Sequence, residues 1–210
     1  METGEPSTGE LSTDELSTDE ALLAAVRDEV LAYGVRRATA TSIAQRAGVS
    51  RVTVYRRGGG IKQLLLDALV DEFRNAVEEV TALVLAEQSP RDGRAAVTAL
   101  AVAMVRKLSE APLVAALLKH DPEMLLPYLV DRHGRSQQLM IEAMTGAIAA
   151  GMADGSIRDG DPALLSVVLL HALTPFVIGL GVVTAKHDRT EVLTEVRQLV
   201  DAYLAPEATS

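Results

Sequence analysis

The stretch that decides the fold is residues 39–62, with the sequence TATSIAQRAGVSRVTVYRRGGGIK. It contains two short runs of helix-compatible residues. Each run is preceded by a residue whose hydroxyl can cap a helix, Thr39 in one case and Ser50 in the other. Between them, Gly48 can take the left-handed backbone conformation that begins a tight turn. Ala44 is small enough to let two helices approach closely. The stretch therefore predicts a helix-turn-helix.

Apolar residues in this stretch have the spacing needed to hold the pair of helices against a preceding helix. They are Ile43, Ala47, Val49 and Val54. The remaining positions of the second helix then face outward, where side chains can reach base edges and phosphates in the major groove of DNA. These outward positions are Ser50, Arg51, Val52, Thr53, Tyr55 and Arg56.

The distribution of charge supports a nucleic-acid partner for this segment, although the chain as a whole carries a net charge of −9. Residues 1–20 contain seven acids and no base, residues 21–62 contain eight bases and two acids, and residues 63–210 contain twelve bases and twenty acids. A small basic block joined to an acidic body is typical of a DNA-binding segment with a separate regulatory domain.

Composition predicts an all-α protein. Hydrophobic residues make up 48% of the 210 residues, and aromatic residues only 3%. Most of the apolar residues are Ala, Leu and Val, and few segments alternate with the period of two that strands require. We expect helices from about residue 18 to Tyr33 and over residues 61–87, 94–109, 136–153, 162–184 and 190–204. Pro112, Pro122 and Pro127 divide residues 110–132 into short pieces.

Three segments follow from these patterns. Residues 1–17 are polar and acidic, with Glu-Leu-Ser-Thr-Asp occurring twice (Glu10–Asp14 and Glu15–Asp19), so we expect a disordered tail. Ser17 or Thr18 would then cap the first helix. We expect residues 18–62 to form the helix-turn-helix domain and residues 63–210 to form a second, helical domain.

The sequence offers little support for catalysis or for a metal. It lacks a nucleophile elbow and a phosphate-binding loop, so we expect no enzyme activity. The absence of cysteine excludes disulfides and cysteine-based zinc sites. The four histidines, His120, His133, His171 and His187, are scattered along the chain. We therefore expect neither a metal site nor a cofactor.

Residues 34–55 resemble the DNA-binding domain of the TetR family of bacterial repressors. In that family a first helix ending in Gly precedes a Thr-capped helix and then the pattern Ile-Ala-x-x-Ala-Gly-Val-Ser-x-x-x-x-Tyr. This chain has Gly34, Thr39, Ile43-Ala44, Ala47-Gly48-Val49-Ser50 and Tyr55 at the corresponding places. The strong match covers about residues 20–70.

One departure from the family pattern follows the recognition helix. The family usually continues Tyr-x-His-Phe-x-x-Lys, whereas this chain has Gly58 in place of the Phe and Ile61 in place of the Lys. We expect a looser hinge at this joint, with Arg57 and Lys62 taking over phosphate contacts. The resemblance further implies that Thr39 and Tyr55 bind phosphates, that Arg51, Val52, Thr53 and Arg56 face the groove, and that Thr41 and Ser50 complete the contact set.

The resemblance also implies that residues 63–210 are the ligand-binding and dimerisation domain. TetR-like proteins are homodimers that bind a palindromic operator and release it when a small molecule binds. The effector expected here is mostly apolar. Residues on the helices that surround the pocket in similar proteins are Met104, His120, Met124, Tyr128, Met140, Met144, His171, Thr174 and Phe176. Residues expected at the dimer interface are Leu180, Val183, Val192, Val196, Leu199, Val200 and Tyr203.

Several alternatives stay open. Within the regulator class, the chain could activate transcription or lack a ligand. Outside it, an enzyme and a membrane-associated helical protein are the rivals, the latter because residues 163–185 contain no Asp, Glu, Lys or Arg. Burial in a core and a dimer interface explains that segment better, since no second comparable segment exists. We therefore expect a cytoplasmic protein whose partners are double-stranded DNA, an effector and a second copy of itself, without a membrane.

Overall fold

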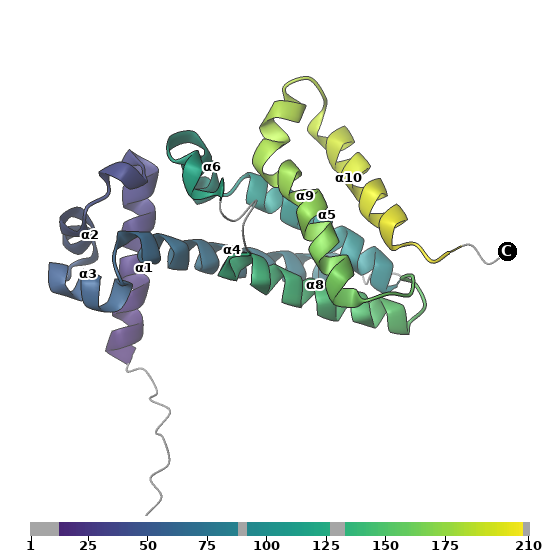
Figure 1. Cartoon of the computed structure of the whole chain (residues 1–210), viewed down its shortest axis with the longest axis horizontal. Helices are drawn as coiled ribbons and strands as arrows, with labels where there is room; N and C mark the ends of the chain where they lie inside the picture. Colours follow the sequence, from purple (N-terminus) through teal and green to yellow (C-terminus); the bar gives the residue numbers. More distant parts are fainter. Residues whose placement is uncertain (1–12, 88–91, 127–132, 208–210) are drawn as a thin grey trace, which may run out of the picture. The chain divides into compact units, whose positions relative to one another are not determined.

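The computed structural model describes residues 13–87, 92–126 and 133–207, and within these ranges every regular element is helical (Figure 1). The all-α prediction is therefore confirmed. The chain divides into two compact units, Met1–Ala68 (unit 1) and Leu69–Ser210 (unit 2). The division lies within the long helix α4, Ile61–Glu87, a few residues beyond the position at which the sequence analysis divides the chain.

Unit 1 consists of α1 (Thr13–Tyr33), the 3-10 turn η1 (Val35–Arg37), α2 (Ala40–Ala47), α3 (Arg51–Gly58) and the first residues of α4. Helix α1 packs against both α2 and α3, and α2 packs against α3. The residues that share its core are apolar and almost fully enclosed: Leu22, Val26, Val30, Ile43, Ala44, Val54 and Leu65. The predicted spacing of Ile43 and Val54 is thus confirmed.

Helix α1 begins earlier than expected. Residues 13–17 belong to α1, so the expected disordered tail 1–17 is wrong for these five positions. Residues 1–12 lie outside the described residues. The reason for the early start is the sequence repeat, because its first copy supplies the same Ser-Thr-Asp sequence as the second.

Unit 2 is built around α5 (Gly93–Ser109), which contacts α6 (Pro112–His120), α8 (Arg135–Ala153), α9 (Pro162–Thr184) and α10 (Arg189–Leu204). The short η2 (Pro122–Met124) follows α6. The common core consists of small and branched aliphatic side chains: Val97, Ala101, Val102, Val105, Ile148, Ile157, Leu165, Leu169, Leu173, Val196, Val200 and Leu204.

The N-terminus of α5 crosses the C-terminal part of α8 at two glycines. A Cβ atom on Gly93 would lie 2.4 Å from the Cα of Gly151, and a Cβ atom on Gly151 would lie 2.5 Å from the Cδ1 of Ile157. The Gly93 amide donates a hydrogen bond to Asp154 Oδ2 at 2.8 Å. Hydrogen bonds from Ser156, together with that of Gly93, lower the pKa of Asp154 below its usual value. The crossing therefore requires glycine at position 93, whereas at Gly151 an added Cβ would meet the movable end of the Ile157 side chain.

Helix α10 is joined to the rest of unit 2 by polar contacts at its ends. Arg94 Nε of α5 lies 3.3 Å from Asp201 Oδ1, and Arg189 Nη2 lies 2.8 Å from Glu110 Oε1. The Arg158 amide donates to the Leu204 carbonyl at 3.0 Å. These contacts set the register in which Val196 and Val200 meet α5.

Candidate nucleic-acid interface

The start of α2 is fixed by a reciprocal pair of hydrogen bonds. The Ser42 amide donates to Thr39 Oγ1 at 3.0 Å, and the Thr39 amide donates to Ser42 Oγ at 3.2 Å. This capping box satisfies amide groups that the first helical turn leaves without a backbone partner. The prediction that Thr39 caps this helix is confirmed.

The turn between α2 and α3 combines a left-handed glycine with a second cap. Gly48 has φ 69° and ψ 24°, a conformation that strains a side-chain-bearing residue. The Val49 amide then donates to the Ala44 carbonyl at 3.0 Å. Two residues after the glycine, Ser50 Oγ accepts from the Thr53 amide at 3.1 Å and begins α3. The helix-turn-helix geometry therefore follows from the Thr39 and Ser50 caps and the left-handed Gly48, all within twelve positions.

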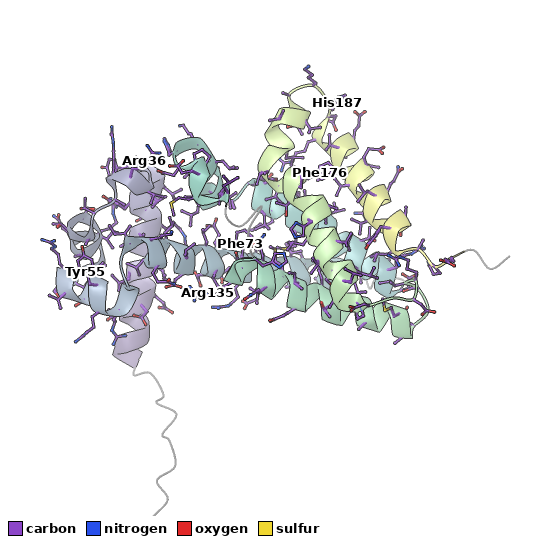
Figure 2. The ribbon with its side chains drawn as sticks, in the orientation of Figure 1. Arg36, Tyr55, Phe73, Arg135, Phe176 and His187 are labelled. Atoms are coloured by element: carbon purple, nitrogen blue, oxygen red, sulfur yellow. The ribbon has the colours of Figure 1, made fainter. Side chains whose placement is uncertain are left out.

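Helix α3 has one buried side and one exposed side. Val54 is 0% exposed and packs into the core of unit 1, whereas Val52 is 71% exposed and Tyr55 is 56% exposed. Arg51 and Arg56 are exposed as well, and Figure 2 shows Tyr55 on this helix. The arrangement presents two guanidinium groups, a phenol and a valine to solvent on a helix anchored from behind.

The other residues predicted to contact DNA fall into two groups. Thr41 and Lys62 are exposed, as are Thr39 and Ser50, whose hydroxyls cap their helices. Thr53 is half-buried, and its Oγ1 lies 2.9 Å from Ser50 Oγ.

Arg57 is held against α1. Its Nη1 lies 3.3 Å from Asp19 Oδ1, and its side chain is 20% exposed. A phosphate contact by Arg57 would have to compete with this ion pair. The same contact helps to fasten the end of α3 to α1.

The joint between α3 and α4 is packed, so the expectation of a loose hinge is wrong. Gly58 is buried at the end of α3, and a Cβ atom there would lie 2.4 Å from Leu64 Cγ. Leu64 therefore fills the space above the glycine and is 3% exposed. Gly59 closes α3 in the left-handed conformation with φ 59°, and the Leu64 amide donates to the Gly60 carbonyl at 3.0 Å.

An ion pair between a buried carboxylate and an exposed guanidinium, which the sequence analysis missed, joins α1 to α2. Glu29 is 5% exposed, and Arg46 Nη2 donates to its Oε2 at 3.2 Å. Arg46 Nη1 also lies 3.7 Å from Asp28 Oδ2. Without this guanidinium the Glu29 carboxylate would be enclosed without a charged partner, which is costly. An acid and a base on the inner sides of adjacent helices are the signal that could have found the pair.

The residues predicted to line an effector site lie on several helices of unit 2. Those that the structure leaves half-buried are Met104, Met124, Met140, Met144, Thr174 and Phe176. Met144 and Phe176 pack against the core of unit 2. His120 and His171 are exposed, and Tyr128 lies outside the described residues.

Two histidines that the sequence analysis considered scattered lie side by side. His133 Nε2 is 2.9 Å from His171 Nε2, although 38 positions separate the two residues. Their ring centroids are 5.2 Å apart. His133 immediately precedes the Gly134 that begins α8, and His171 lies on α9.

Four of the residues predicted at a dimer interface are core residues of unit 2 instead. They are Leu180, Val192, Val196 and Val200. The correction has a simple cause, since the inner face of α10 packs on α5 of the same chain. Val183 is 37% exposed and Leu199 is 41% exposed, so these two positions stay accessible. Tyr203 is half-buried, with the Arg158 guanidinium 4.9 Å from its ring centroid.

Helix α9 is the one helix of the described residues that is long and apolar enough to cross a membrane. Its most apolar window has a mean hydropathy of 2.2, and 33% of that window is buried within the chain. Length and composition alone give the same result for a core helix of a soluble protein. The exposed apolar side chains of α9 are Leu164, Val168, Val182 and Val183.

Comparisons with known proteins agree with this geometry. No family model matches the chain. An HTH-type transcriptional regulator of Mycobacterium tuberculosis (strain H37Rv), itself described as uncharacterized, is 30% identical over 185 residues, covering 87% of this chain and 92% of its own.

Solved structures show the fold. The transcriptional repressor QsdR of R. erythropolis, from the TetR family, has a TM-score of 0.64 and 18% identity, with 95% of this chain and 100% of that chain covered. The regulator FadR of Bacillus subtilis, in complex with stearoyl-CoA, has a TM-score of 0.59 and 15% identity, with 88% and 98% covered. With its helix-turn-helix, this chain belongs to the HTH-type transcriptional regulators, and its fold is that of solved TetR-family structures.

Proposed function

We propose that this regulator is a repressor that binds a palindromic operator as a homodimer. The observation that carries the proposal is the two-sided character of α3. Val54 anchors the helix, while Arg51, Tyr55 and Arg56 are exposed beside it. Guanidinium groups donate to the O6 and N7 atoms of guanine, and a phenol donates to phosphate oxygens. Arg51 and Arg56 are the candidates for base contacts, and Tyr55 and Thr39 for phosphate contacts.

The local charge favours the same assignment. Residues 21–62 carry six more bases than acids, whereas the remainder of the chain is acidic. Neutralising phosphates with this block releases counterions and drives association. The acidic remainder would be repelled by the same phosphates, which restricts the orientation of binding.

A second copy of the chain is needed because α3 has only eight residues. One helix of this length contacts too few base pairs to select a site in a genome. Two copies related by a two-fold axis read a palindrome, with half-sites one helical turn, about 34–36 Å, apart. We place this protein, like its target DNA, in the cytoplasm.

The surface that we assign to the dimer is the exposed apolar side of α9 together with α10. Its members are Leu164, Val168, Val182, Val183 and Leu199. Exposed apolar side chains of this number on adjacent helices favour contact with another protein surface. Tyr203 lies on the same helix as Leu199 and completes the set as a half-buried member.

Unit 2 is proposed to bind a mostly apolar effector among its half-buried residues Met104, Met124, Met140, Met144, Thr174 and Phe176. Methionine side chains such as Met140 and Met144 adapt to irregular apolar ligands. Because the FadR structure of similar fold holds stearoyl-CoA, long-chain acyl thioesters are the first compounds to test. Helix α4 runs from unit 1 into unit 2 and is the element through which effector and DNA would influence each other. Linkage requires each to weaken the other's affinity by the same factor.

The function is tested by selecting duplexes from a random pool with the purified full chain. The expected result is a palindromic consensus bound by two chains per duplex, with an affinity that falls steeply as salt rises. Selection of no consensus would refute the proposal. In a reporter strain, deletion of the protein should raise expression from the selected site. A fall in reporter expression after the deletion would show that the protein is an activator.

The dimer surface is tested separately by Leu199→Glu, which places a charge on an exposed position and leaves the core of unit 2 intact. Sedimentation should show loss of the dimer, while Arg106→Glu, an exposed change on α5, should leave it unaltered. A dimer that persists in the Leu199→Glu variant would show that the interface lies on another surface.

A further inference from the structure

His133 and His171 form a pair whose geometry suits a purpose beyond the hydrogen bond they share. Their Nε2 atoms are 2.9 Å apart. In that arrangement one ring carries its proton on Nε2 and donates, and the other accepts with a bare Nε2. The two Nε2 atoms thus face each other between α9 and the residue before the Gly134 N-cap of α8.

Local contacts hold the backbone beside each histidine. The Gly134 amide donates to Gln137 Oε1 at 2.8 Å, which holds the start of α8 immediately after His133. On α9, Leu170 and Leu173, one position before and two positions after His171, are buried and anchor the helix. Pro175 cannot donate an amide hydrogen to the His171 carbonyl, so the helix is locally interrupted at this histidine.

The distance is close to that of two imidazoles sharing a metal ion. Bonds of about 2.0–2.1 Å in tetrahedral geometry place two ligand nitrogens about 3.3–3.4 Å apart. The present separation therefore needs an opening of about 0.4–0.5 Å, which side-chain torsions can supply. His171 is exposed and His133 half-buried, so solvent can reach the point between the rings and occupy the remaining coordination positions.

We propose that His133 and His171 bind a divalent first-row transition cation, with Zn²⁺ as the representative ion. Imidazole nitrogen suits Zn²⁺, Ni²⁺ and Cu²⁺, and the chain has no cysteine that would favour softer ions. Within the described residues no group of three or more His, Asp or Glu side chains gathers around one point, so water completes the coordination. On binding, the donating ring shifts its proton to Nδ1 and both Nε2 lone pairs face the metal. No proton is lost from the neutral pair.

Metal binding at this point would join the start of α8 to the middle of α9 inside unit 2. It does not depend on the proposed repressor function, because neither histidine belongs to unit 1. Since His171 is also a candidate effector contact, the metal is tested in the absence of any effector and of DNA.

The experiment titrates Zn²⁺ into the full chain by calorimetry and follows the thermal midpoint, with Co²⁺ absorption as a direct signature of the ligands. One equivalent per chain should bind and raise the midpoint. His133→Ala and His171→Ala should each weaken binding at least about tenfold, since loss of even an outer-shell partner of a metal ligand costs that much. The double variant should lose no more than either single variant, because the two rings act together.

Matched controls come from the two other histidines. His120 and His187 are exposed at the end of α6 and in the turn between α9 and α10, where Figure 2 labels His187. Their alanine variants should bind Zn²⁺ as the native chain does, with the same Co²⁺ spectrum. Equal losses from all four variants would show adsorption to surface histidines and overturn the proposal. So would native affinity in His133→Ala or His171→Ala.

Discussion

The two units of the chain obtain their structure in different ways. Unit 1 depends on polar groups within short stretches of sequence: the Thr39 and Ser42 capping box, the left-handed Gly48 and the Ser50 cap. Unit 2 depends on aliphatic packing between helices far apart in sequence, with a crossing at Gly93 and Gly151. The difference teaches that the helix-turn-helix can be specified locally, whereas the core of unit 2 is specified by long-range packing.

The largest effect is expected from Gly93→Ala in unit 2. The added Cβ would meet the backbone of Gly151 at 2.4 Å, and a backbone atom in a packed crossing cannot move away. The free energy of unfolding should fall toward the upper end of the about 1–3 kcal/mol typical of overpacking. Chemical denaturation followed by circular dichroism measures it.

Gly146→Ala is the matched control because it lies on α8 with nothing within 4 Å of its added Cβ. It should raise the stability by roughly 0.5–1 kcal/mol, since Gly is the weaker helix former. Equal effects of the same sign from the two substitutions would refute the close crossing.

Gly58→Ala should destabilise unit 1 by a smaller amount. The added methyl would lie 2.4 Å from Leu64 Cγ, but a leucine side chain can rotate away, so we expect roughly 1–2 kcal/mol. In a double-mutant cycle with Leu64→Ala the two changes should cost less together than their sum. Additive costs would mean that Leu64 does not fill the space above Gly58.

Thr39→Ala should lower stability by about 1 kcal/mol, because it removes one half of the capping box. Thr39→Ser keeps the hydroxyl and should retain most of the stability. Thermal unfolding of both variants against the native chain checks the effect. Equal losses from Ala and Ser would show that the methyl group, rather than the cap, matters.

The smallest expected effect is the dependence of stability on pH at Asp154. Hydrogen bonds from Ser156 and Gly93 lower the pKa of Asp154, so its ionised form favours the folded state. That contribution is present above the usual Asp pKa of about 3.9 and is lost as the pH falls through the lower folded value. Asp154→Asn should therefore be less stable than the native chain at neutral pH and approach it in acid. A constant difference at every pH would contradict this role.

Local chemistry explains which parts of the molecule the sequence could predict. Thr39, Gly48 and Ser50 act on residues within three positions of themselves, so their roles are visible in the sequence. The burial of Gly58 under Leu64 was not visible, because a family comparison shows the missing Phe but not the side chain that replaces it. Helical periodicity showed that α10 has an apolar face. It could not show that Val196 and Val200 face α5 of the same chain while Leu199 stays exposed.

Contacts between residues far apart in the chain could not be predicted from the sequence for the same reason. His133 and His171 are 38 positions apart with no repeating signal between them, and only the pairing of α8 with α9 brings the rings together. The Glu29–Arg46 pair likewise requires the packing of α1 on α2. Such contacts depend on how helices cross, which residue spacing along one helix does not determine.

The most direct test of the central claim is the affinity of Arg51→Ala for the selected operator and for a duplex changed at one symmetric base pair. If the exposed side of α3 reads the DNA, this variant loses about 1–3 kcal/mol per half-site and discriminates less at that base pair, while Arg106→Ala on α5 binds as the native chain does. An Arg51→Ala variant with native affinity and native discrimination would contradict the account.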